Sequence, residues 1–161
     1  MKINKETYEE FLFIADPILK NSSFLSQKEY IQHGNTSVYN HCIRVALTAY
    51  KKACRKKKKY NLTDVVYGAL LHDFFLYDWH ILDHKNGHKR FHGFHHPQIA
   101  YINANNNFII NKKVKNIIRS HMWPLIPYRL PLSKEAWLIC ICDKVISIKE
   151  IFNLNGEIQI C

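Results

Sequence analysis

The sequence is poor in glycine and proline, with five of each among its 161 residues. Both residue types interrupt regular structure, so their scarcity favours long helices joined by short connections. The chain shows no internal repeat of the length that solenoid proteins have. Its length suits one domain built around a single sizeable core.

Long apolar runs are missing too. The longest extends from Ala136 to Cys142 and is bounded by Glu135 and Asp143, which is far short of the roughly 20 residues that a membrane span needs. The first residues of the chain lack the apolar region of a signal peptide. We therefore expect a cytoplasmic protein without membrane contact.

Cysteine occurs five times, an odd number, and no pair has the CxxC spacing of a zinc ribbon or a redox motif. In a reducing compartment such residues act as small buried hydrophobes. The sequence therefore excludes a disulfide framework as the source of stability. The five residues are Cys42, Cys54, Cys140, Cys142 and Cys161.

Acidic residues are few: 13 Asp and Glu oppose 23 Lys and Arg, and the formal net charge is +10. Part of the excess falls in a basic run over residues 51–59. Such a run attracts anions, including nucleotides and nucleic acid. It is equally typical of a solvated helix end in a lysine-rich composition. Because no aromatic residues alternate with these cations, nucleic acid is the least favoured partner.

Apolar periodicity predicts an all-α fold in one compact helical bundle. We expect N-terminal helices over residues 1–32, a main domain over 33–152, and a tail over 153–161 that is extended or disordered. Proline at position 17 is expected to interrupt the first helix. The expected helices cover residues 5–19, 24–32, 37–58, 62–74, 97–107, 112–122 and 133–152.

Residues 77–95 are predicted to form a long loop, because they contain Gly87 and Gly93 and show no apolar stripe. Long loops inside compact domains are usually functional. This stretch begins a series of histidines spaced by four, which would form a metal-binding stripe on a helix. The glycines oppose a helix, so chance is the default interpretation and a lid or secondary metal contact is the alternative. The series is His80, His84, His88, His92 and His96.

The centre of the chain holds a polar pair, His72-Asp73, at the end of an apolar helix expected from residue 62. An imidazole and a carboxylate are costly to bury unless something compensates them. The pair could be a helix cap with a hydrogen-bonded neighbour. It could also bind a divalent metal, since neutral imidazole and ionised carboxylate are natural metal ligands.

Four more polar residues lie in or beside apolar helical stretches. Each alone is readily explained by a hydrogen bond or an ion pair. Together with the central pair they make four histidines and two aspartates on five helices, a good inventory for a two-metal site. The four are His41, His96, His121 and Asp143.

The order of these residues resembles the HD-domain superfamily of metal-dependent phosphohydrolases, and the surrounding segments look like a small bacterial branch of it. The resemblance implies that residues 33–152 form the HD domain. It implies a first metal held by His41, His72, Asp73 and Asp143. It further implies a second metal held by His96 and His121, with Asp73 bridging both ions.

The resemblance also implies an activity. The expected enzyme is a phosphatase or phosphodiesterase that hydrolyses a small, nucleotide-like phosphate ester or anhydride, by attack of a metal-activated hydroxide on phosphorus. We predict catalytic roles for Asp73 and Lys144. The expected cofactor is one or two divalent ions of Fe, Mn, Co, Ni or Zn, with Mg as a further candidate.

Residues that contact the substrate are harder to assign. Candidates are His33, Arg44, Asp78 and His92, each of which could instead be an ordinary polar surface residue. Better-known branches of the superfamily carry a Lys or Glu three residues after the His-Asp pair, where this chain has Leu76. The substrate therefore stays open. A non-catalytic metal- or nucleotide-binding regulatory module is the alternative function, and a homo-oligomer is compatible with the sequence.

Overall fold

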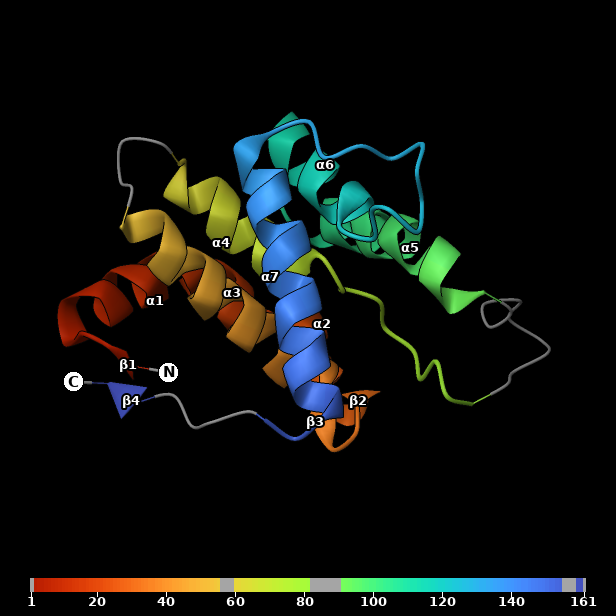
Figure 1. Ribbon diagram of the computed structural model, residues 1–161, viewed down its shortest axis with the longest axis horizontal. Helices are drawn as coiled ribbons and strands as arrows, with labels where there is room; N and C mark the ends of the chain where they lie inside the picture. Colours follow the sequence, from red (N-terminus) through yellow and green to blue (C-terminus); the bar gives the residue numbers. More distant parts are fainter. Residues whose placement is uncertain (1, 56–59, 82–90, 155–158, 161) are drawn as a thin grey trace.

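The computed structural model describes residues 2–55, 60–81, 91–154 and 159–160. Helices dominate the described part, which confirms the predicted all-α fold (Figure 1). The helices are α1 (Lys5–Leu19), α2 (Ser22–Leu25), the 3-10 turn η1 (Ser26–Glu29), α3 (Val38–Cys54), α4 (Leu62–Leu71), α5 (His92–Asn107), α6 (Lys112–Ser120) and α7 (Lys134–Ile151).

Two short strand pairs complete the fold. Strand β1 (Lys2–Ile3) pairs in parallel with β4 (Gln159–Ile160), so the two chain ends lie close together (Figure 1). The predicted tail therefore includes an extended edge. Strand β2 (Ile31–His33) pairs antiparallel with β3 (Thr36–Ser37).

Most helices begin at a residue that caps them. Side chains of Asn or Ser accept a hydrogen bond from a backbone N–H of the first turn, which satisfies a donor that the helix itself leaves free. The sequence places such a residue before every α-helix except α5. The caps are Asn4, Asn21, Ser37, Asn61, Asn111 and Ser133.

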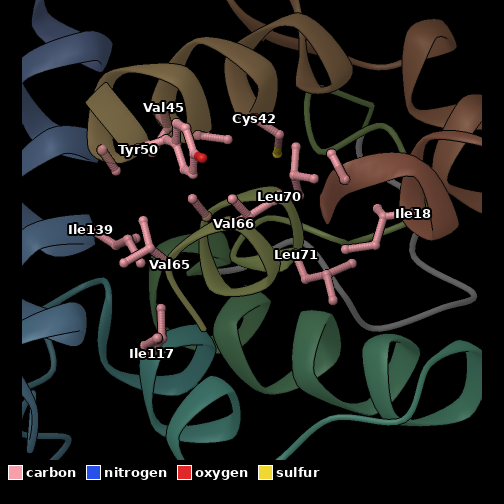
Figure 2. Packing of buried hydrophobic residues seen from close by; sticks show 14 of the residues in the cluster. Ile18, Cys42, Val45, Tyr50, Val65, Val66, Leu70, Leu71, Ile117 and Ile139 are labelled. Carbon is pink, nitrogen blue, oxygen red and sulfur yellow. The ribbon is translucent and has the colours of Figure 1, made fainter. Parts of the chain in front are cut away.

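Helix α4 lies at the centre of the core. It packs against α1, α3, α5, α6 and α7, and a helix surrounded in this way must be apolar on nearly every side. A Cβ at Gly68 would lie 2.6 Å from Ile117 Cγ2, so glycine allows α4 and α6 to approach closely. Figure 2 shows the packed side chains, with Val65, Val66, Leu70 and Leu71 of α4 among Ile18, Cys42, Val45, Tyr50, Ile117 and Ile139.

This arrangement places the end of α4 inside the molecule. His72 is the residue at which the helix ends, and Asp73 follows it; both are buried. The C-terminal end of α6, the first turn of α3 and the middle of α7 lie around the same point, and each of these helices packs on α4. The polar pair therefore lies where several helices can contribute further side chains.

Two predictions for the N-terminal part are wrong, although the predicted bounds of the first helix, 5–19, are confirmed. Residues 24–32 do not form a helix: the chain makes the short α2 and η1 and then enters β2. The reason is a tight hairpin, in which Gly34 adopts a φ of 55° that favours glycine. Pro17 does not interrupt α1, which continues through it to Leu19.

The predicted loop over residues 77–95 is wrong at its end, because α5 begins at His92 rather than at Pro97. Phe91 precedes the helix with a φ of 69°. Gly93 lies within the first turn, where a Cβ would make a tight 3.1 Å contact with Leu125 Cδ2. Residues 82–90 of the predicted loop, including His84 and His88, lie outside the described part of the chain.

The basic run is only partly described. Lys51 and Lys52 lie in the last turn of α3 and Arg55 caps it, where cations interact favourably with the helix dipole. Residues 56–59 lie outside the described ranges. None of the described helices is both long and apolar enough to cross a membrane.

Candidate metal centre

The structure brings together all six residues that the sequence analysis predicts as metal ligands. His41 comes from α3, His72 and Asp73 from the end of α4, and Asp143 from the middle of α7. The remaining two come from α5 and from the residue that ends α6. These two are His96 of α5 and His121, which follows α6. All six side chains are buried.

Four of these residues form a first cluster. One ligand atom from each of His41, His72, Asp73 and Asp143 lies within 4.8 Å of the others. His41 Nε2 is 3.2 Å from Asp143 Oδ1, and His72 Nε2 is 3.3 Å from Asp73 Oδ2. Two imidazoles and two carboxylates in such a group provide nitrogen and oxygen ligands of the kind that divalent transition metals prefer.

A second cluster shares Asp73 with the first. Asp73 Oδ1 lies 3.1 Å from His96 Nε2 and 3.3 Å from His121 Nε2. The other carboxylate oxygen, Oδ2, faces the first cluster. Asp73 is therefore positioned to bind a cation with each of its oxygens, as a bridging carboxylate does.

Hydrogen bonds fix which nitrogen of each ring faces the site. The Nδ1 atoms of His72, His96 and His121 lie 2.8, 3.0 and 2.8 Å from the backbone carbonyls of Ala69, His92 and Ile118. A carbonyl oxygen only accepts, so each Nδ1 must carry the proton and each Nε2 presents a lone pair in the neutral ring. Metal-ligating histidines are usually held in this way.

The resulting lone pairs lack partners. His96 Nε2 and His121 Nε2 are only 2.8 Å apart, and two lone pairs at that distance repel unless a proton or a cation lies between them. His72 Nε2 and Asp73 Oδ1 are buried without a hydrogen-bond partner in the described part of the chain. Buried polar atoms are rarely left this way. These unpartnered atoms fit divalent metal ions.

The carboxylates in the centre are held in the ionised form. Burial raises the pKa of the Asp73 carboxyl, but His72, His121 and His96 outweigh it and hold that pKa well below its usual range. Burial acts in the same direction on Asp143, and the neighbouring His41 and His72 likewise hold the pKa of its carboxyl well below normal. Ionised carboxylates are the form that binds metal.

Asp73 is also held from the side of the hairpin. Gln32 Nε2 donates a hydrogen bond to Asp73 Oδ2 at 2.7 Å, and Gln27 Nε2 donates to the Asp73 carbonyl at 2.8 Å. Sequence reasoning missed both glutamines. No local signal marks them, because their partner lies more than 40 residues away and the strand that carries Gln32 was expected to be helical.

Glu150 is a third residue of the candidate site that sequence reasoning missed. Its Oε2 accepts a hydrogen bond from His41 Nδ1 at 2.7 Å, and its Oε1 accepts one from Arg44 at 3.2 Å. The hydrogen bonds from His41 and Arg44 offset the free-energy cost of burying the Glu150 carboxylate. A signal was present, since Glu150 lies seven residues after Asp143 and therefore on the same face of α7.

We expect Glu150→Gln to weaken metal binding by roughly 10- to 100-fold, because a carboxylate that orients a ligating histidine makes that histidine a stronger ligand. The measurement is a metal titration in competition with a chelating dye. Glu29→Gln, which removes one exposed carboxylate elsewhere, is the matched control. Unchanged affinity in the Glu150 variant would show that the Glu150 carboxylate does not strengthen metal binding through His41.

A cavity of about 990 Å³ opens beside the two clusters. Asp73, His96, His121 and Asp143 line its floor. Among the described residues that line this cavity, Lys144 is the only lysine or arginine. The other walls are largely apolar and come from Trp79, Met122, Pro124, Leu125 and Ile148.

Four of the predicted catalytic and substrate-binding residues line this cavity: Asp73, which also belongs to both clusters, and His33, His92 and Lys144. The Lys144 ammonium donates to the His121 carbonyl at 2.8 Å, so it also holds the residue that ends α6. The ring of His92 stacks on those of Trp79 and His96. Burial, together with nearby His96, lowers the pKa of His92 to about 3, so its imidazole is neutral.

Two predicted substrate-binding residues do not line the cavity. Arg44 instead donates to Glu150 and to Thr36, because the buried carboxylate of Glu150 attracts its guanidinium. Asp78 accepts hydrogen bonds from the backbone and ring of His80. Leu76 packs against the hydrophobic core, which is consistent with the absence of an acid or base at that position.

Comparison with known families gives one clear result. No curated protein and no solved structure matches the chain. Residues 38–147, more than half of the chain, match the HD domain family. The matched region contains all six residues of the two clusters, including the adjacent His72 and Asp73. The chain therefore belongs to the HD-domain family.

Proposed function

We propose that this protein is a metal-dependent phosphohydrolase that acts on a small phosphate ester or anhydride. The observation that carries the proposal is the shared carboxylate of Asp73, whose two oxygens face two separate groups of histidines. A cavity large enough for a small-molecule substrate opens on the same residues. Membership of the HD-domain family supports the same conclusion.

The first cluster would hold one divalent ion and the second cluster another. When bound, such ions supply an activated water and neutralise charge on phosphoryl oxygens. The chain's own contribution is to fix the ligands. Gln32 orients the Asp73 carboxylate and Glu150 orients His41, so the ligand geometry is largely set before a substrate binds.

The walls of the cavity indicate what kind of substrate is favoured. Lys144 alone among the described lining residues carries a permanent positive charge, and its ammonium already contacts main-chain oxygens. Apolar and aromatic side chains such as Trp79 and Leu125 make up much of the remaining wall. This environment favours an ester with an apolar or aromatic body, such as a nucleoside, over an anhydride with many charges.

The proposal is tested by loading purified protein separately with Mn²⁺, Fe²⁺, Co²⁺, Ni²⁺ and Zn²⁺. Each form is then assayed with phosphomonoesters, cyclic nucleotides and nucleoside polyphosphates. We expect hydrolysis of one of these classes, its loss on chelation and its return when the metal is restored. Protein that stays metal-free in metal-replete medium and hydrolyses none of these compounds would refute the proposal.

A second function is favoured by one observation. Leu76 occupies the position at which better-known HD-domain branches carry a Lys or Glu, and here its side chain packs against the core. A domain without that group could bind metal and a nucleotide as a regulatory module. Tight nucleotide binding to the metal-loaded protein, without hydrolysis of any substrate class, would favour this second function over the first.

A further inference from the structure

A second concave site lies on another part of the surface. Its volume is about 480 Å³, and it shares no lining residue with the cavity at the metal centre. One side is a face of α6 and the other is the segment 128–132. Four cations line it, and none of its described lining residues is acidic. The four are Lys112, Lys115, Arg119 and Arg129, which we call the basic groove.

The sequence of α6 explains three of these cations. Lys112, Lys115 and Arg119 are spaced by three and four residues, so they share one face of the helix. The opposite face of α6 is apolar and packs into the core through Val114 and Ile117. The groove is therefore the solvent-facing side of the same helix that ends at the metal centre.

The fourth cation is brought in by a specific contact. The side chain of Asn116 donates to the Leu130 carbonyl at 3.0 Å and accepts from the Leu132 N–H at 2.9 Å. These two hydrogen bonds hold segment 128–132 against α6. Arg129 consequently lines the same groove as Arg119, although the two are ten positions apart along the chain.

Three guanidinium nitrogens in the groove lack hydrogen-bond acceptors in the described part of the chain. Arg119 Nε and both Nε and Nη1 of Arg129 are inaccessible to solvent and have no hydrogen-bond partner among the described residues. Their recorded contacts are with the rings of Tyr101 and Tyr128. Burial, together with repulsion from Arg119, lowers the pKa of Arg129. Clustered cations with unpaired donors are unfavourable unless an anion compensates them.

We propose that the basic groove binds a small polyanion with adjacent phosphate groups, such as a diphosphate or a nucleoside polyphosphate. Guanidinium donors match phosphate oxygens well, and two of them line this groove together with two lysines. The cations surround a concavity from two sides, whereas a nucleic-acid backbone requires an extended basic track. The site lies apart from the metal centre and does not depend on hydrolysis there.

The test is isothermal titration of inorganic pyrophosphate into protein that has been stripped of metal and transferred to metal-free, low-salt buffer. Removing the metal prevents pyrophosphate from binding at the metal centre, so the result is independent of the proposed function. We expect one saturable site. Arg119→Gln combined with Arg129→Gln should weaken binding by roughly tenfold or more, because each guanidinium contributes charged hydrogen bonds.

The matched control combines Lys20→Gln with Arg55→Gln, which removes two exposed cations outside the groove; its affinity should stay within about twofold of the unsubstituted protein. If circular dichroism shows that the arginine variant is unfolded, Lys112→Gln combined with Lys115→Gln replaces it.

Equal weakening in control and groove variants, or no saturable binding up to roughly 1 mM, would overturn the proposal. Tighter binding of a single-stranded oligonucleotide, weakened by the same groove substitutions, would overturn the small-ligand assignment.

Discussion

Asp73→Ala is expected to remove bound metal from both clusters and to lower phosphohydrolase activity by roughly a thousandfold or more. The reason is that each carboxylate oxygen faces a different pair of histidines. Removing the side chain therefore takes one ligand from each cluster at once. Metal content is measured by elemental analysis of the purified protein, and activity is measured with the substrate class found by the screen.

Asp78→Ala is the matched control for this variant. It removes an aspartate five residues further along that does not line the metal-centre cavity. Its metal content and activity should equal those of the unsubstituted protein. The bridging role of Asp73 would be wrong if Asp73→Ala kept two equivalents of metal, or if both aspartate variants lost metal equally.

His96→Ala combined with His121→Ala is expected to remove one of two metal equivalents and to lower activity by roughly a hundredfold or more. These residues supply both histidines of the second cluster, whereas the first cluster keeps its full set of four ligand residues. The two histidines also repel each other without an intervening cation. Removing them should therefore leave the fold intact, as circular dichroism would show.

His95→Ala provides the control, because His95 neighbours His96 but is exposed. It should retain both metal equivalents. Loss of both equivalents in the His96 and His121 variant would mean that the clusters do not bind independently. Loss of metal in the His95 variant would mean that the ligand on α5 is misassigned.

Much of the candidate metal centre could be predicted from sequence because its residues violate local expectations. Asp143 lies in an apolar helix, and His72 ends one that is buried on nearly all sides. Such positions are unfavourable for polar residues unless they share a partner, so the pattern itself indicates a common site. Some helix starts were equally readable, since caps such as Asn61 and Ser133 have recognisable chemistry.

The rest could not be predicted, because it depends on contacts between residues far apart in the chain. Arg44 lies one helical turn after His41, which correctly indicates a shared face. Spacing could not reveal that Glu150, 106 residues away, attracts its guanidinium away from the cavity. Gln32 acquires its role only when the hairpin brings it to Asp73.

The start of α5 shows a different limit of local reasoning. Gly93 and Pro97 are helix-breaking residues in general, yet both lie inside this helix. Tertiary packing decides the outcome, because Gly93 leaves space for Leu125 and the rings of His92 and His96 stack one turn apart. The regular spacing of those two histidines was the signal that favoured a helix there.

The most direct test of the central claim is anomalous X-ray diffraction from crystals of the metal-loaded protein, recorded at the absorption edge of the added metal. We expect two anomalous peaks on either side of the Asp73 carboxylate. One should be ligated by His41, His72 and Asp143, and the other by His96 and His121. A map with no anomalous peak at Asp73, in protein that carries metal elsewhere, would contradict the account.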